Sequence, residues 1–527
     1  MTRSSDKLFE AERQPNPSYQ RYLDFEDRFR RLRAQIFSML TLVSGFFYLG
    51  WLGGQTYWSG ELHAYIFLAA ECLAYFLLLL LGFDTWRLRF HRPEGLNRPV
   101  SYPVDVFITY CGEPLPIIQT TLAAVKNLDY ESYQVYVLDD HGLPALASLA
   151  QSLGFHYHSR PLAGWPLNDS KSGNLNFGLG LSQGEIILAL DADQVPQPDI
   201  ISRMIGFFTL PHVAYVQSQQ SFYLPDEDPF FNRDEIFYEV VQLSNDQANA
   251  VISCGSGVLY RRQALEEIGG FATWNMVEDL TTSYELVSHG WKGIYFPYIL
   301  SRGLAPETLR GVYRQRFQWC LDAMRLFFWD NPLLKKGLNL KQRLHFLIIM
   351  VTYLISGLVL PIFYLIPLYC YYWGISFLQG QEWVFLSIRG GYLFLTILSF
   401  RYLFFKKAAL KQFKILCGLF PVYALGILAA LWYLPGRKPL YRANNLTPWT
   451  EASSAICILP HLGIILLHLA LPFFSIYYGW APLRLIATNA LFSAFTIWVL
   501  GEMVILGLRK PQWSPSMDPR LVYGFES

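Results

Sequence analysis

The sequence predicts an α/β domain with a mixed, mostly parallel sheet that is inserted between transmembrane α-helices. The chain of 527 residues is 52% hydrophobic and only 16% charged, with a mean hydropathy of +0.23, which is too apolar for an ordinary soluble protein. Long apolar stretches gather near both ends of the chain. Between them, residues 100–330 alternate short apolar runs with stretches of helical period, a pattern typical of βαβ units.

Composition excludes several classes of function. The formal net charge is +1, so there is no general basic character and we expect no nucleic-acid partner. The seven cysteines are scattered and form no Cys-x-x-Cys pair, which argues against a zinc site and against a disulfide framework. The aromatic content of 17% suits the belts at membrane interfaces and would also suit a sugar-binding channel.

The N-terminal part reads as a transmembrane hairpin. Residues 36–53 and 63–82 are apolar stretches of membrane-spanning length. Arginines precede the first stretch and follow the second, whereas the short loop between them has none, so the positive-inside rule places both ends in the cytoplasm. We therefore expect a cytosolic segment and hairpin over residues 1–95, embedded in the lipid bilayer, and a cytosolic domain with an interface helix over residues 96–332.

The C-terminal part reads as a further membrane bundle over residues 333–510, followed by a cytosolic tail at 511–527. Predicted spans are residues 344–372, 415–434, 453–478 and 482–508, which bring the total to six. Residues 383–405 contain Arg389 and Arg401, which are costly in a lone lipid-facing helix. We therefore expect that stretch to lie along the interface or to re-enter, although this places the lysines at 406–414 outside, against the positive-inside rule.

The stretch at residues 186–199 carries the clearest chemical pattern. It reads IILALDADQVPQPD, an apolar run that ends in Asp191 and Asp193. A short apolar run bounded by Gly184 and Pro196 is typical of a buried strand, and open α/β sheets bind ligands at the carboxyl ends of their strands. Mg²⁺ is commonly held by one or two carboxylates together with substrate phosphates. The pattern predicts a divalent cation that carries a diphosphate, with a solvated Asp-x-Asp turn as the alternative.

Further polar segments of this domain follow predicted strands or open predicted helices. They supply the candidates Thr109, Tyr110 and Glu113 after one strand, Asp139 and Asp140 after the next, Lys171 in a small-residue turn, Cys254 and Gly255 in SCGSG, Glu278 and Asp279 in VED, and Gln315, Arg316 and Trp319 in QRFQW. Structural alternatives exist, because an aspartate after a strand is often a helix N-cap and two acids that open a helix complement its dipole. Their combination in one domain beside the membrane favours a functional site.

In this order and spacing, the segments YVLDDHG, KSGNLN, DADQVP, VQSQQSFYLPDEDPF, SCGSGVLYRR, VEDLTTSYEL and QRFQW resemble processive family-2 glycosyltransferases. The resemblance is to bacterial cellulose synthase catalytic subunits in particular, and it covers residues 100–330 well. It implies a GT-A fold for residues 96–332 and a membrane-embedded inverting enzyme that uses a UDP-sugar, UDP-glucose foremost, to extend a β-linked glucan and pass it across the membrane.

The resemblance also implies roles for the candidate residues. Contacts to the UDP-sugar would come from Thr109, Tyr110, Glu113, Asp139, Asp140, Lys171, Asp191, Gln315 and Arg316. Asp191 and Asp193 would bind Mg²⁺ or Mn²⁺, and Asp279, beside Glu278, would be the general base. Cys254, Gly255 and Trp319 would lie near the growing glycan acceptor. The chemistry agrees, because transfer needs a neutralised diphosphate leaving group and a base for the acceptor hydroxyl.

The expected location is the inner (plasma) membrane, with several spans, a cytosolic catalytic domain and possible accessory export subunits. Alternatives are another β-polysaccharide synthase, of the β-1,3-glucan, glucomannan, chitin or hyaluronan type, a non-processive glucosyltransferase with a lipid acceptor, and a catalytically dead membrane scaffold.

Three features depart from the family pattern. Gln318 stands where the Q-R-x-R-W motif has arginine, which removes a bidentate partner for the donor's diphosphate. Residues 441–449, YRANNLTPW, lack the lysine of the family's gating loop. Few residues follow the last apolar stretch, so we expect no regulation by cyclic-di-GMP through an appended binding barrel.

Overall fold

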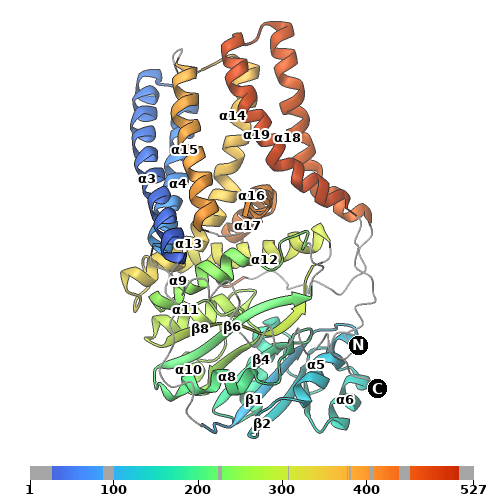
Figure 1. The fold of residues 1–527 in the computed structure, drawn as a ribbon. Helices are drawn as coiled ribbons and strands as arrows, with labels where there is room; N and C mark the ends of the chain where they lie inside the picture. The colour runs from blue at the N-terminus through green and yellow to red at the C-terminus, as the bar shows by residue number, and fades with distance from the viewer. Residues whose placement is uncertain are drawn as a thin grey trace.

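The computed structural model describes residues 26–86, 100–223, 228–306, 308–376, 378, 381–403, 409–437 and 451–509. An α/β domain makes up one half of the molecule, and a set of upright helices makes up the other (Figure 1). The predicted gating-loop segment at 441–449 and the predicted tail at 511–527 lie outside the described residues.

The α/β domain is built on an eight-stranded sheet with the order β3-β2-β1-β4-β7-β6-β8-β5. The strands are β1 (Val104–Tyr110), β2 (Tyr133–Asp139), β3 (His156–Ser159), β4 (Ile186–Asp191), β5 (Val195–Pro196), β6 (Val213–Tyr223), β7 (Val258–Arg261) and β8 (Lys292–Leu304). Strands β3, β2, β1 and β4 pair in parallel, as do β6 and β8, whereas β7 runs antiparallel to both neighbours and β5 runs antiparallel to β8. The predicted mixed, mostly parallel sheet is confirmed.

Side chains alternate between two apolar cores, one on each face of this sheet. In β1, Val106 and Ile108 enter one core and Phe107 enters the other, because successive strand residues point to opposite faces. Helices α5 (Leu115–Lys126), α6 (Pro144–Ser152) and α8 (Ile200–Met204) contribute to the first core. Helices α7 (Ser170–Leu181), α9 (Gln242–Ala248), α10 (Arg262–Glu267) and α11 (Glu278–Ser288) contribute to the second.

Strand register brings the polar ends of three strands together. Thr109 of β1 pairs with Asp191 of β4, and Tyr110 pairs with Asp139 of β2. Since these strands are parallel, their carboxyl ends meet at one edge, which is where open α/β sheets bind ligands. Helix α12 (Leu309–Trp329) lies between this domain and the upright helices (Figure 1).

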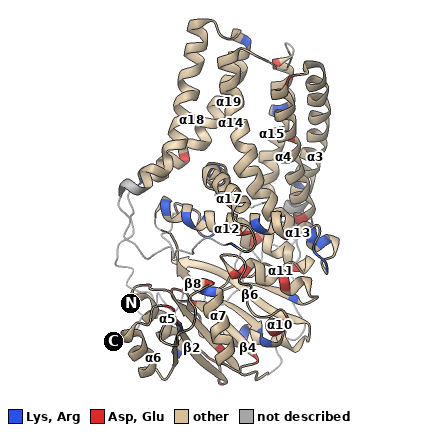
Figure 2. Cartoon of the chain, turned by 180° about the vertical axis from the view of Figure 1, so that it is seen from behind, with Lys and Arg blue, Asp and Glu red and all other residues tan. Residues whose placement is uncertain are grey.

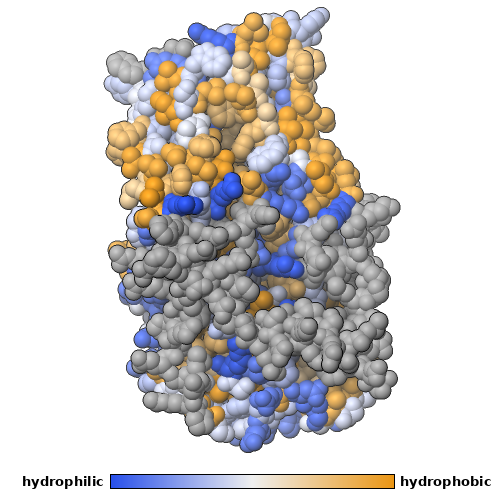
Figure 3. Space-filling model, viewed as in Figure 1, coloured by the Kyte–Doolittle hydropathy of each residue, from blue (hydrophilic) through white to orange (hydrophobic). Residues whose placement is uncertain are grey.

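Six helices or continuous helical stretches in the described residues are long and apolar enough to cross a membrane. They comprise α3 (Glu26–Ser59), α4 (Leu62–Thr85), α13 (Leu340–Leu354) continued through a π-helical turn (Ile355–Val359) into α14 (Leu360–Trp373), α15 (Glu382–Leu403), α18 (Glu451–Tyr478) and α19 (Leu483–Leu508). On the face shown in Figure 3, apolar residues predominate over this half, and hydrophilic residues gather at its lower edge. Charged residues are few along the upright helices and concentrate at and below α12 (Figure 2).

The predicted placement of residues 383–405 along the interface is wrong. Helix α15 is one of the six candidate spans and packs along α3, where Thr41 and Ser399 are hydrogen-bonded at 2.8 Å. Its Arg389 is paired with Glu71 of α4 at 2.7 Å, so its charge does not face lipid alone. The prediction failed because the free-energy cost of burying Arg389 was considered without its partner Glu71, which neutralises the charge.

The predicted span at 415–434 is not a single helix in the structure. This stretch is split between α16 (Ala409–Gly418) and α17 (Phe420–Trp432), two helices bent by 47° that lie above α12 (Figure 1). Helix α16 contacts the α/β domain, because Gln412 donates a hydrogen bond of 3.2 Å to Asp234. Lys411 and Lys414 are therefore on the side of the α/β domain, and the conflict with the positive-inside rule disappears for them.

Candidate active site

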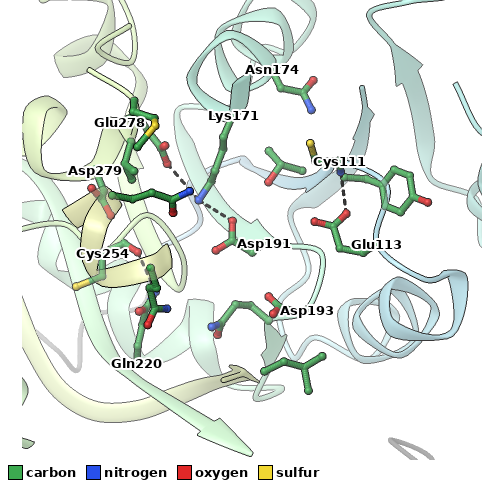
Figure 4. Close-up of a pocket in the computed structure, with 18 of the residues that line it drawn as sticks. Cys111, Glu113, Lys171, Asn174, Asp191, Asp193, Gln220, Cys254, Glu278 and Asp279 are labelled. Carbon is green, nitrogen blue, oxygen red and sulfur yellow. Dashed lines mark hydrogen bonds and ion pairs between the residues drawn. The ribbon is translucent and has the colours of Figure 1, made fainter. Parts of the chain in front are cut away.

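A pocket opens at the carboxyl ends of β1 and β4, between the start of α11 and α12 (Figure 4). Most predicted site residues line it together: Thr109, Tyr110, Glu113, Asp140, Lys171, Asp191, Asp193, Cys254, Glu278, Asp279, Gln315 and Trp319. Asp139, Gly255 and Arg316 are not among the lining residues. Segments spread over more than 200 positions in the sequence thus converge on one cavity.

Lys171 is the central charge of the pocket. Its ammonium lies 2.6 Å from Asp191 and 3.1 Å from Glu278, and it donates a hydrogen bond of 2.8 Å to the Gly255 carbonyl (Figure 4). Burial alone would lower the pKa of Lys171, but the charges of Asp191 and Glu278 outweigh burial and hold the pKa well above its ordinary value. Lys171 is therefore a permanent cation that links the end of β4 to the start of α11.

The carboxylates of Asp191, Asp193 and Glu113 form an acidic corner beside this lysine. Burial, together with the negative charges of Asp191 and Glu113, raises the pKa of Asp193 to about 7. A divalent cation would relieve this repulsion. Among the described residues, no group of three or more His, Cys, Asp or Glu side chains is placed to hold a metal ion. The Asp191–Asp193 pair offers carboxylate oxygens, which are the ligands that Mg²⁺ and Mn²⁺ take together with substrate phosphates.

Asp279 lies in the first turn of α11, where its Oδ1 accepts a 2.6 Å hydrogen bond from the backbone N–H of Leu280. Burial raises the pKa of Asp279, and the charge of neighbouring Glu278 raises it further. A carboxylate with a raised pKa is a stronger base than an exposed aspartate, so this environment suits removal of a proton from a hydroxyl group.

Gly255 lets the backbone pass close to these charged groups. Its φ is +75°, and a Cβ at this position would lie 3.0 Å from Lys171 Nζ and 3.2 Å from Glu278 Oε1. The adjacent Cys254 lines the pocket, but burial raises the pKa of its thiol, which makes it a poor nucleophile. The SCGSG turn therefore shapes the pocket through its backbone.

Asp139 is engaged in holding its own loop. Its carboxylate accepts hydrogen bonds from the backbone N–H groups of His141, Gly142 and Leu143 at 2.6, 3.0 and 2.8 Å, and from the Tyr157 hydroxyl at 2.6 Å. Asp139 therefore stabilises the loop between β2 and α6, and the alternative of a helix N-cap is wrong, because the N-cap residue of α6 is Leu143. Its predicted contact with the nucleotide stays a prediction.

Asp140, next to it, lines the pocket and forms a bidentate pair with Arg160, at 2.6 Å from Nε and 2.5 Å from Nη2. The guanidinium also donates to the carbonyls of Pro166, Asn168 and Ser170. Arg160 therefore ties the DDHG loop to the turn that carries Lys171.

Helix α12 presents Gln315, Gln318 and Trp319 to the pocket. Arg316 instead pairs with Asp234 at 2.7 Å and places its guanidinium 4.5 Å from the centre of the Trp319 ring. Gln318, which replaces the motif arginine, thus lines the pocket. Arg316 does not line it and instead contacts the Trp319 ring and Asp234.

Sequence reasoning missed several lining residues, among them Cys111, Asn174, Gln194 and Gln220. Gln220 donates hydrogen bonds to the carbonyls of Cys254 at 2.9 Å and Ser256 at 3.2 Å, and accepts one from the Tyr238 hydroxyl. It thereby fixes the SCGSG turn. The sequence signal that could have identified Gln220 was its uncharged amide side chain near the end of a long strand, within the VQSQQSFY segment.

Comparison with known proteins identifies the domain. The model of the family described as "Glycosyltransferase like family 2" matches residues 103–321. These residues form a family-2 glycosyltransferase domain. Cellulose synthase 1 of Komagataeibacter xylinus is 34% identical over 347 residues, which cover 62% of this chain and 22% of that protein. The cellulose synthase catalytic subunit [UDP-forming] of Pseudomonas fluorescens (strain SBW25) is 34% identical over 336 residues, covering 60% of this chain and 44% of that protein. The match thus spans less than half the length of these relatives.

Among solved structures, a mannosyltransferase from Pyrobaculum calidifontis in complex with GDP-Man and Mn²⁺ superposes with a TM-score of 0.52 and 17% identity, over 69% of this chain and 99% of that one. At this identity the likeness concerns the fold alone. The predicted resemblance to cellulose synthase-like family-2 glycosyltransferases is confirmed, and so is the GT-A fold class next to membrane helices.

Proposed function

We propose that this protein is a membrane-embedded inverting glycosyltransferase that uses a UDP-sugar, UDP-glucose foremost, to extend a β-linked glucan. One observation carries the proposal: Lys171 bridges Asp191, at the predicted cation site, and Glu278, the neighbour of the predicted base. A site for a diphosphate leaving group and a site for a hydroxyl nucleophile therefore adjoin in one pocket. The intact charged set argues against a dead scaffold.

The donor end of the pocket would hold the UDP-sugar. Asp191 and Asp193 would bind Mg²⁺ or Mn²⁺, which when bound neutralises the diphosphate. Lys171 adds a permanent positive charge at the same place. Thr109, Tyr110 and Glu113, at and after the end of β1, line the side where the nucleotide would lie. The cellulose synthase relatives that are named UDP-forming support uridine as the nucleotide.

At the acceptor end, Asp279 would accept the proton of a sugar hydroxyl while that oxygen attacks the anomeric carbon. The bond between this carbon and the diphosphate oxygen breaks, and its electrons leave with UDP. Attack from the opposite face inverts the anomeric centre, so an α-linked donor gives a β-linkage. The indole of Trp319, held by Arg316, offers a flat surface on which an acceptor sugar ring would stack.

We place the enzyme in the inner (plasma) membrane, with a cytosolic catalytic domain over residues 96–332 and a bundle over 333–510. The six candidate spans and the lysines of α16 on the side of the catalytic domain support this orientation. The polymer would leave through the bundle, with accessory export subunits as possible partners.

The test is product analysis with purified protein in lipid vesicles, supplied in turn with each radiolabelled UDP-sugar. We expect a polymer from UDP-glucose that a β-1,4-glucanase degrades. A polymer cleaved only by another linkage-specific hydrolase would indicate a different β-polysaccharide synthase. Label that extracts into organic solvent would indicate transfer to a lipid, an outcome that Gln318 in the motif position favours. Absence of transfer from every donor would contradict the proposal.

A further inference from the structure

The loop that leads into α11 is fastened to α12 by one buried carboxylate. Asp322, on the face of α12 turned away from solvent, accepts hydrogen bonds from the backbone N–H groups of Met276 at 3.1 Å and Val277 at 2.6 Å. These are the two residues directly before Glu278 and Asp279. The backbone carbonyl of Asp322 also accepts a 3.3 Å hydrogen bond from the Asn275 side chain.

These hydrogen bonds stabilise the start of α11, which has no capping side chain of its own. Its N-cap residue, Val277, has no side chain that can accept a hydrogen bond, so the start of the helix has no cap of its own. Each of the two carboxyl oxygens of Asp322 accepts one of these backbone N–H groups, so both residues before α11 are held against α12. The Asn275 side chain adds a second tie by donating to Thr281 at 2.9 Å, inside the first turn of α11. The position of this turn is therefore determined by α12.

The same helix also lines the pocket. Gln318 and Trp319, about one turn before Asp322, are lining residues, and Leu321 of α12 and Leu280 of α11 belong to one apolar core. Helix α12 thus carries both Trp319, the proposed acceptor surface, and Asp322, which holds the residues that precede the proposed base Asp279. A shift of α11 against α12 would change the distance between the two.

We propose that Asp322 is a positioning residue, which holds Asp279 at the correct place relative to the acceptor surface on α12. This inference rests on the proposed role of Asp279 as general base. Asp322 is two turns beyond Gln315 along α12 and is not among the lining residues of the pocket, so it acts through the backbone of residues 276–277. The alternative is that it only stabilises the folded domain.

The experiment compares Asp322→Asn with Asp246→Asn. Asp246 is the control, since it is a half-buried carboxylate that also accepts a backbone N–H, that of Tyr295 at 2.8 Å, and it is not among the residues that line the pocket. Hydrogen–deuterium exchange of peptides that cover residues 272–281 reports on the loop without requiring activity. Transfer rates at saturating donor and UDP affinity report on the site. Asn275→Ala serves as a second variant that loosens the loop from its own side.

For Asp322→Asn we expect faster exchange in residues 272–281, UDP affinity within about twofold of wild type, and a turnover number reduced about 10- to 100-fold, because small displacements of catalytic groups have effects of this size. Asn275→Ala should act in the same direction, and Asp246→Asn should leave both the exchange of this loop and turnover unchanged. Unaltered exchange in Asp322→Asn, or faster exchange with wild-type turnover, would overturn the proposal. If the wild-type protein transfers no sugar, the proposed function fails, and the exchange data still decide whether Asp322 holds the loop.

Discussion

At the scale of single residues, the pocket is organised by charge. One lysine is shared by two carboxylates that come from different elements, and two further acidic residues, Glu113 and Asp193, lie nearby. Bringing several carboxylates together in a buried place is unfavourable unless cations are present. The pocket is therefore suited to a ligand that brings positive charge to the Asp191–Asp193 side.

Gly255 provides a test of the close backbone approach in this pocket. Gly255→Ala should destabilise the protein by about 1–2 kcal/mol, because an L-residue is strained at positive φ. It should also reduce transfer more than tenfold, since the new methyl group would contact Lys171 and Glu278. Gly269→Ala is the control, because Gly269 has a φ of +83° but open space around its Cβ position. Thermal melting and transfer assays should show similar destabilisation of the two variants and loss of activity in one; equal activities would contradict the steric argument.

The pH dependence of transfer tests the environment of Asp279. A general base must be ionised, so the rate at saturating donor should fall as the pH decreases through its pKa. Because burial and the charge of Glu278 both raise the pKa of Asp279, this fall should occur above pH 4, the range of exposed aspartates. Glu278→Gln removes one of the causes of the raised pKa and should move the fall to lower pH. Glu285→Gln, further along α11, should leave it unchanged, and a shift to higher pH in Glu278→Gln would exclude this explanation.

The motif residues of the pocket were predictable to the extent that they sit at strand ends. Asp191 and Thr109 are neighbours because parallel strands place their carboxyl ends at one edge, a property of the pattern itself. The orientation of a side chain is not part of a motif, which is why Asp139 and Arg316 were predicted to contact the donor although the structure directs them to their own loop and to Asp234. Asp322 and Gln220 act through backbone groups, and no sequence pattern records that.

At the scale of elements, Asp234 connects the membrane part to the pocket. It lies before the π-helical turn at Phe237–Val241, with a φ of +41°, and it binds both Arg316 of α12 and Gln412 of α16. Since the Arg316 guanidinium contacts the Trp319 ring, a displacement of α16 would be transmitted through Asp234 and Arg316 to the proposed acceptor surface.

Asp234→Ala should remove the partner of Arg316 and free Trp319 to change orientation. We expect about a tenfold lower rate of transfer to an added oligosaccharide, with UDP affinity preserved, because the donor end of the pocket is untouched. Glu502→Gln is the control, since Glu502 pairs with Lys414 of the same helix α16 at 3.2 Å. Loss of UDP affinity in Asp234→Ala, or equal effects in both variants, would show that the contact has another role.

Helices α15, α16 and α17 show which features of the membrane part could be predicted from the sequence and which could not. Length and hydropathy predicted α3, α4, α18 and α19 because these properties belong to each segment alone. The role of α15 depended on Glu71, more than 300 positions away, which turns an unfavourable arginine into one half of a buried ion pair. The break between α16 and α17 falls where Pro421 enters the first turn of α17, a signal that the apolar composition of the stretch concealed.

At the scale of the whole molecule, the proposed orientation places the end of α17 and the α/β domain on one side of the membrane, with the turn between α18 and α19 on the other. Arg325 of α12 donates hydrogen bonds to the carbonyls of Leu434 and Arg437 at 3.2 Å each. These bonds connect α12 to the residues that follow α17. In a variant without its native cysteines, Gly436→Cys should react with a membrane-impermeant maleimide in inverted vesicles and Tyr477→Cys in intact cells. Labelling of both from the same side would refute the six-span arrangement.

The most direct measurement for the central claim compares wild-type protein with Asp279→Asn in purified form, with UDP affinity and sugar transfer determined on the same samples. The amide cannot accept the hydroxyl proton, whereas the groups expected to bind UDP remain unchanged. We predict UDP affinity close to wild type and a transfer rate reduced by about 10²- to 10⁴-fold, the usual contribution of a general base. Transfer at the wild-type rate, or turnover that persists while UDP affinity is lost, would contradict the assignment of this pocket as the site of glycosyl transfer.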